Sequence, residues 1–192
     1  MKAYYELLGE IERDVKRLRE ASGGVPCPST CFACCHNTAT MAISEVEARD
    51  LKLGLDALPE QLRAHIRAKA ERSIKKLEAH GYNVETIMPD TGMEAVSVVR
   101  GKPEGECPML IGGVCSVYEH RPVICRVWGY PIHNGNDLAC CHKTFLGKRD
   151  RYRPLNYNHY WKTCQTLSTE LGATQKTPNC YLVSQLLSES KA

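Results

Sequence analysis

Apolar residues recur at helical spacing through the first twenty positions of the chain. The apolar stripe consists of Tyr4, Leu7, Leu8, Ile11, Val15 and Leu18. Side chains three and four positions apart share one face of an α-helix, so this spacing predicts an amphipathic helix. The pair Gly23-Gly24 follows the stripe and is expected to end the helix.

Two further helices are predicted between residues 44 and 81. Ser44 and Glu47 have the spacing of a capping box, in which each side chain binds a backbone N–H of the first helical turn. Pro59 suits the first turn of the second helix, because a proline there loses no helical hydrogen bond, and Gly81 ends the pattern. The predicted buried stripe of this second helix consists of Leu62, Ile66, Ala70, Ile74 and Leu77.

Strand patterns are short and few. Residues 38–43 alternate weakly between apolar and polar side chains, and residues 95–99 form the clearest β-type run. Two more helices are predicted near the C-terminus, one that Asn156 caps and Gly172 closes, and one that begins at residues 177–178. The pattern predicts a mostly α fold with a few short strands, in which helices join cysteine-rich loops.

The composition is typical of a globular chain. Its 192 residues are 43% hydrophobic and 24% charged, and the net charge of +3 is too small to indicate nucleic acid or an anionic membrane as partner. The first residues are too polar for a signal peptide, and no apolar run approaches the roughly 18 residues of a membrane span. We therefore expect a cytoplasmic protein whose thiols are kept reduced.

Eleven cysteines carry the strongest chemical signal, because nine of them fall into two clusters that we call knots. The first knot consists of Cys27, Cys31, Cys34 and Cys35. The second knot consists of Cys107, Cys115, Cys125, Cys140 and Cys141. Residues 36–106 contain no cysteine, so the clustering predicts that two distant segments meet in a thiolate site.

Thiolates at these spacings are typical ligands of soft metals such as zinc, copper(I) and the iron of iron–sulfur units. Cys31 and Cys34 form a Cys-x-x-Cys turn that supplies half of a tetrahedral site, and the Cys107 region is predicted to supply the rest. Cys34 and Cys35 are adjacent, and successive side chains of extended backbone point in opposite directions. They would therefore serve two neighbouring metals or two irons of one cluster, or one of them would be a packed thiol.

The motifs around the knots also resemble those of a known family. They are Cys27…Cys31-x-x-Cys34-Cys35, then Cys107-Pro-Met-Leu, then Cys115-x-Val-Tyr-Glu-x-Arg-Pro-x-x-Cys125-Arg, then Cys141-His-Lys. This arrangement is similar to the YkgJ-type, or CxxCxxCC, cysteine-cluster family of zinc- or iron-chelating domains, over residues 27–145. Three residues separate the first two cysteines here, whereas the family pattern has two.

The resemblance implies eight metal ligands, which would suit two four-thiolate sites, or one cluster with additional structural thiols. These ligands are Cys27, Cys31, Cys34, Cys35, Cys107, Cys115, Cys125 and Cys141. We accordingly predict one metal-stapled domain in three segments: an N-terminal helix at 1–24, a cysteine-cluster region at 25–145 and a C-terminal helical extension at 146–192 packed on the same core.

Polar residues near the knots have two interpretations each. Arg121 and Arg126 flank Cys125, and they would either contact an anionic substrate or the cluster sulfurs, or pair with Glu119 or cap backbone carbonyls around the Arg-Pro turn. Three histidines beside the cysteines are expected to surround the site or lie at the surface rather than bind metal. They are His36, His133 and His142.

Two cysteines and one basic helix are expected to be structural. Cys164 and Cys180 lie among apolar helical positions and are predicted to be buried thiols. Lysines and arginines at 59–80 are interspersed with glutamates, so they are predicted to form a solvated face rather than a phosphate-binding one.

The sequence favours a metal-binding protein that holds zinc or an iron or iron–sulfur centre and has a structural, redox or metal-handling role with a protein partner. One alternative is an iron-dependent enzyme that modifies a peptide or a small anionic substrate. A second alternative is a zinc-stabilised interaction module. No nucleotide-binding loop, Ser-His-Asp order or paired-carboxylate pattern indicates another chemistry.

Overall fold

Helix is the main secondary structure of the computed structural model, and its strands are short, which confirms the predicted mostly α fold class. No helix in the described part of the chain is both long and apolar enough to cross a bilayer. The predicted strand at 95–99 lies outside the described residues, as do Cys27 and His142. The described ranges are 1–23, 31–39, 41–81, 105–135, 137–141, 143–145, 151–173 and 176–188.

The chain divides into two compact units, each built from two separate stretches of sequence. Unit 1 comprises residues 1–31 and 121–172, and unit 2 comprises residues 32–120 and 173–192. The bounds of the two units do not coincide with those of the three segments predicted from the sequence. The bounds of those segments remain predictions.

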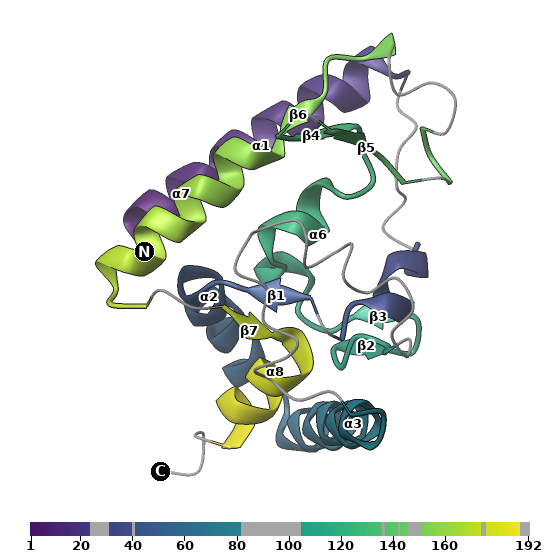
Figure 1. Ribbon diagram of the computed structural model, residues 1–192, viewed down its shortest axis with the longest axis vertical. Helices are drawn as coiled ribbons and strands as arrows, with labels where there is room; N and C mark the ends of the chain where they lie inside the picture. The colour runs from purple at the N-terminus through teal and green to yellow at the C-terminus, as the bar shows by residue number, and fades with distance from the viewer. Residues whose placement is uncertain are drawn as a thin grey trace. The chain divides into compact units, whose positions relative to one another are not determined.

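Unit 1 is built on two long helices that pack side by side (Figure 1). They are α1, Lys2–Ala21, and α7, Tyr157–Glu170. The short helix α6, Val123–Val127, contacts both of them. A three-stranded sheet completes the unit, with β4, Ile132–Asn134, between antiparallel β5, Asp137–Ala139, and parallel β6, Leu155–Asn156.

The helices of unit 1 follow the sequence pattern closely. The buried face of α1 consists of Tyr4, Leu7, Leu8, Ile11 and Leu18. The side-chain oxygen of Asn156 accepts a hydrogen bond from the His159 backbone N–H at 3.2 Å, so Asn156 is the predicted cap of α7. Gly172 follows the helix with φ of +83°, a conformation that favours glycine and ends the helix as expected.

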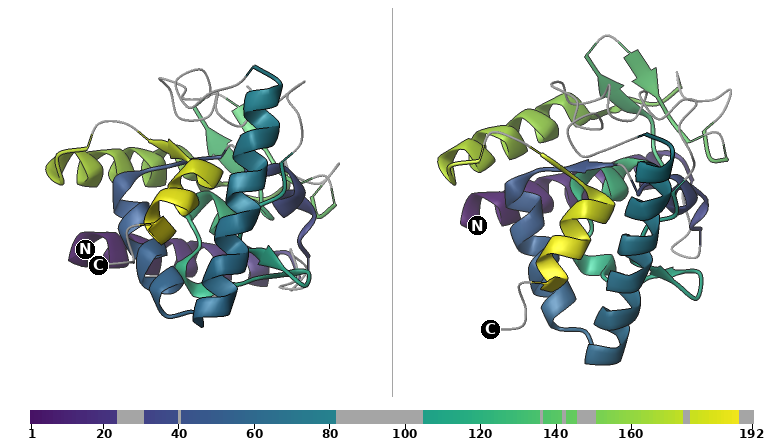
Figure 2. Two further views of the ribbon diagram at one scale, coloured as in Figure 1. Left: turned by 90° about the horizontal axis from the view of Figure 1, so that it is seen from below. Right: turned by 60° about the horizontal axis from the view of Figure 1, so that its bottom comes forward.

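Unit 2 contains three helices, two short 3₁₀ turns and two small antiparallel pairs of strands among its described residues. The helices are α2, Glu45–Asp56, α3, Glu60–Ala79, and α8, Asn179–Ser188. The 3₁₀ turns are η1, Ala33–Asn37, and η2, Tyr118–His120. The strand pairs are β1, Ala42–Ile43, with β7, Thr177–Pro178, and β2, Leu110–Ile111, with β3, Val114–Cys115. Helix α8 packs along α3 and also contacts α2 (Figure 2).

Local signals also fix the helices of unit 2, whereas strand pairing changes one predicted boundary. The capping box of Ser44 and Glu47 is present at the start of α2, and Pro59 and Gly81 flank α3 as predicted. Residues 177–178 were predicted to open the last helix, but they pair with β1 as strand β7, and the helix begins at Asn179. Residues 177–178 are extended because they pair with β1, so the helix can begin only after them.

Candidate metal centre

The first knot enters unit 2 as a 3₁₀ turn, which corrects the expectation of extended backbone at its adjacent cysteines. Cys34 and Cys35 lie in η1, and the Cys35 N–H donates to the Phe32 carbonyl at 2.9 Å. A 3₁₀ helix has about three residues per turn, so neighbouring side chains diverge by about 120° rather than pointing in opposite directions.

The end of the first knot and the start of the second meet through their backbones in unit 2, and the thiolate site that their clustering predicted remains a prediction. The backbone N–H of Cys107 donates to the carbonyl of Cys35 at 2.6 Å. Nearby, the N–H of Ala39 donates to the carbonyl of Gly105 at 3.0 Å. These two bonds join the backbone after the first knot to the backbone that opens the second.

A tight hairpin follows Cys107. Strands β2 and β3 pair Leu110 with Cys115, and the Leu110 N–H donates to the Cys107 carbonyl at 3.1 Å. The turn uses Gly113 with φ of +78°, where a Cβ would also come within 3.2 Å of the Phe32 ring. Phe32 of the first knot segment thus packs on the hairpin of the second.

The sulfur of Cys107 is buried and accepts hydrogen bonds. The residue is 7% exposed, and the Asn179 side-chain nitrogen donates to its Sγ at 3.4 Å. Burial raises the pKa of the Cys107 thiol, and hydrogen bonds from the Met109 backbone and the side chains of Asn179 and Thr38 oppose that rise. The nearby positive charge of Lys69 also lowers the pKa of Cys107.

An ion-pair network surrounds the backbone junction of the two knots. Glu106, next to Cys107, pairs with Lys69 of α3 and with the His36 ring, whose Nδ1 lies 3.0 Å from Oε2. The hydrogen bond from Lys69 is the main reason why the pKa of Glu106 lies below its usual value. His36 is exposed, as expected of a histidine that lies beside the site rather than in it.

The predicted ligands occur in both units. Unit 2 contains Cys34, Cys35, Cys107 and Cys115, and the ranges of unit 1 include Cys27, Cys31, Cys125 and Cys141. Within the residues that the structure describes, no three His, Cys, Asp or Glu side chains form a group that could hold a metal ion. The metal and its ligands therefore remain predictions, and the metal-stapled part of the fold prediction stays with them.

The cysteines predicted to be structural are in the core. Cys164 on α7 is 1% exposed, and Cys180 on α8 is fully buried beside Ala39 and Leu77. Burial raises the pKa of Cys180 to about 12, which keeps this thiol neutral.

Arg126 has the structural role that the sequence allowed for it. Its Nε donates to the Arg121 carbonyl at 2.9 Å, and its guanidinium lies 3.8 Å from a Glu12 carboxylate oxygen. The Arg126 side chain is 7% exposed, and its bond to the Arg121 carbonyl links it to the Arg-Pro turn that leads into α6.

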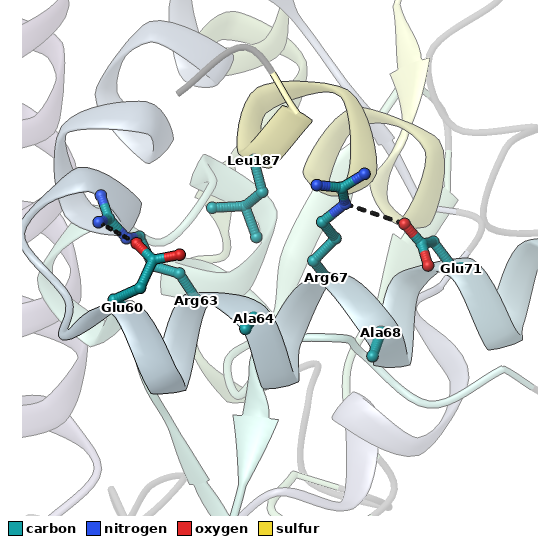
Figure 3. Close-up of a pocket in the computed structure, with 7 residues that line it drawn as sticks. All are labelled: Glu60, Arg63, Ala64, Arg67, Ala68, Glu71 and Leu187. Atoms are coloured by element: carbon teal, nitrogen blue, oxygen red, sulfur yellow. Dashed lines mark hydrogen bonds and ion pairs between the residues drawn. The ribbon is translucent and has the colours of Figure 1, made fainter. Parts of the chain in front are cut away.

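A groove of about 320 Å³ runs between α3 and α8 (Figure 3). Ala64, Ala68 and Leu187 supply its apolar lining. The two arginines that line it are each paired with a glutamate of the same helix, and the distances are 2.5 Å for Arg63 to Glu60 and 2.9 Å for Arg67 to Glu71. The pairs agree with the predicted solvated face of this helix.

Two polar contacts beside the knots were not predicted. Asn179 reaches Cys107 across 72 positions of sequence, and an asparagine at a helix start gives no signal beyond capping. His120 lies in η2, and its Nδ1 is 3.2 Å from the buried carboxylate of Asp50 on α2. A histidine one position before an Arg-Pro pair carries no local sign of that partner.

Comparison with known proteins identified no relative of this chain. No family model, curated protein or solved structure matches the chain. The resemblance to the YkgJ-type family therefore rests on the cysteine motifs alone.

Proposed function

We propose that this chain is a metal-binding protein that holds zinc or an iron or iron–sulfur centre through the thiolates of its two knots. The observation that carries the proposal is the hydrogen bond between the Cys107 N–H and the Cys35 carbonyl. It brings together two cysteine-rich segments that 71 cysteine-free residues separate in the sequence, residues 36–106. Segments joined this way are what a metal cross-link between distant parts of a chain requires.

The four cysteines of unit 2 fit the ligand number of a thiolate site. Tetrahedral zinc and the common iron–sulfur clusters each take about four cysteine ligands in proteins. Cys34 and Cys35 come from the first knot, and Cys107 and Cys115 come from the second. Burial raises the pKa of the Cys107 thiol, so a bound cation would be needed to hold this sulfur as the thiolate.

The test is to purify the protein without oxygen, record its visible spectrum, and measure zinc, iron and acid-labile sulfide per chain. A brown protein with labile sulfide would indicate an iron–sulfur unit and a redox role. A colourless protein with bound zinc would favour a structural role. Cys35→Ser and Cys107→Ser are each expected to lower the metal content.

The matched control is Cys164→Ala, which changes a buried cysteine outside the predicted ligand set. This variant is expected to keep the metal content of the wild type. Wild-type protein that is fully reduced and still takes up neither zinc nor iron would refute the proposed function.

A further inference from the structure

Asn179 is fixed in position by the backbone around it. It is the first residue of α8 and is fully buried. Its own N–H donates to the Met41 carbonyl at 2.8 Å, and the N–H of Cys180 donates to the Ala39 carbonyl at 2.8 Å. The start of α8 is therefore bound to the segment that follows the first knot.

The side chain of Asn179 spans the two knot segments. Its Nδ2 donates to the Thr38 carbonyl at 3.2 Å and to the Cys107 sulfur at 3.4 Å. Because a carbonyl only accepts hydrogen bonds, the Thr38 contact determines which end of the amide faces the sulfur. The oxygen Oδ1 of Asn179 is buried and bonds to nothing among the described residues, a cost that the two bonds of Nδ2 offset.

The Asn179 amide donates to the Cys107 sulfur, whereas the nearby Thr38 hydroxyl donates to the Cys35 carbonyl at 3.5 Å. A neutral thiol is a weak acceptor and gains little from such an arrangement. A thiolate gains more, because hydrogen bonds to the charged form stabilise it. The buried Asn179 amide therefore fixes the orientation of the buried Cys107 sulfur.

We propose that Asn179 is a positioning residue of the thiolate site, whose amide hydrogens orient the Cys107 sulfur and stabilise its negative charge toward a soft divalent cation. The inference rests on the proposed function and extends it to a helix outside residues 27–145, the part that resembles the cysteine-cluster family. Hydrogen bonds to a coordinating sulfur tune both the affinity and the electronic properties of the metal.

The test uses Co²⁺ as the probe in the full-length protein, because thiolate-bound Co²⁺ has a charge-transfer band that reports on the sulfur. Asn179→Leu removes the donor at nearly constant volume. We expect about tenfold to hundredfold weaker Co²⁺ binding in competition with a chelator, as for other residues that support a metal ligand. We also expect the charge-transfer band to move to longer wavelength, because the sulfur loses a hydrogen bond that withdraws electron density.

The control is Tyr181→Phe, which removes a buried hydroxyl two positions along the same helix, one that bonds to no described group. It is expected to keep both the affinity and the band position. Asn179→Ser is a milder second variant, too short to reach the sulfur, in case the leucine variant does not fold. In a Cys107→Ser background, the Asn179 variants are expected to cause no further loss, because the residue acts through that sulfur.

The outcomes separate this inference from the proposed function. Wild-type protein that binds Co²⁺ while the Asn179 variants keep its affinity and spectrum would overturn the positioning role alone. A wild-type protein that binds no Co²⁺ and no zinc would overturn the proposed function and this inference with it.

Discussion

Tyr160 shows how one side chain makes the packing of α1 against α7 specific. Its ring is fully buried, and its hydroxyl donates to the Asp14 carboxylate of α1. Burial and the neighbouring Asp14 charge raise the pKa of Tyr160 above its ordinary value of 10.0. The folded state therefore stabilises the neutral phenol of Tyr160 relative to its phenolate.

Tyr160→Phe is expected to lower the free energy of unfolding near neutral pH by about 1.5–3 kcal/mol, the range for a hydrogen bond to a charged group. A folded-state pKa that is raised stabilises the protein below the unfolded pKa of 10.0, and this stability is lost as the pH rises further. The difference between wild type and variant should therefore shrink above pH 10. Denaturant unfolding at several pH values measures it, and a difference that stays constant up to pH 11 would contradict the assignment.

Helix α2 contains a glycine in its interior that the packing of η2 explains. A Cβ at Gly54 would lie 2.7 Å from Cδ2 and 2.9 Å from Cβ of His120. The same ring is held at Asp50, one helical turn earlier on the same face of α2. The missing side chain thus allows η2, which lies between Cys115 and the Arg-Pro turn, to approach α2 closely.

Gly54→Ala is expected to destabilise the protein by about 1–3 kcal/mol, as overpacking of a tight contact does. Helix propensity alone predicts the opposite sign, a gain of about 1 kcal/mol for alanine over glycine. Chemical denaturation of the variant distinguishes the two. In a His120→Gly background both the ring and the Cβ that a side chain at position 54 would meet are absent, so the same substitution should there be stabilising, and a destabilising effect in both backgrounds would refute the explanation.

At the scale of the whole molecule, the predicted ligands divide evenly between the two units. The ranges of each unit include two predicted ligands from the first knot and two from the second, and Cys140 of the second knot lies outside the predicted set. Four thiolates are the number that one tetrahedral site takes. We propose two four-thiolate sites, one of the two arrangements that eight ligands allow, the other being one cluster with additional structural thiols.

Cys107→Ser is accordingly expected to remove about half of the bound metal, and Cys141→Ser the other half, since each site takes four ligands. Metal analysis of both variants beside wild type measures this. Removal of all metal with a chelator should lower the melting temperature of the wild type, because metal-binding free energy contributes to folding. If either single substitution empties the whole chain, the protein holds one shared cluster instead.

The sequence by itself determined the long helices and most of their ends, but not the start of α8 or the short helix α6. The stripe of α1, the capping box at Ser44, the cap at Asn156 and the closing Gly172 all follow from contacts within about four positions, which a pattern along the chain records directly. The clustering of cysteines predicted that two distant segments meet in a thiolate site; backbone of the two segments does meet at Cys35 and Cys107, and the thiolate site remains a prediction.

Only the tertiary structure decided what each distant segment contacts. The pairing of β7 with β1, the approach of His120 to Gly54 and the hydrogen bond from Asn179 to Cys107 join residues far apart in sequence. Such contacts form because the free energy gained by packing whole elements exceeds the entropic cost of closing long loops. A local sequence pattern records neither of these two quantities. For this reason the chain shows where its thiols cluster, whereas the fold shows which groups surround the Cys107 sulfur.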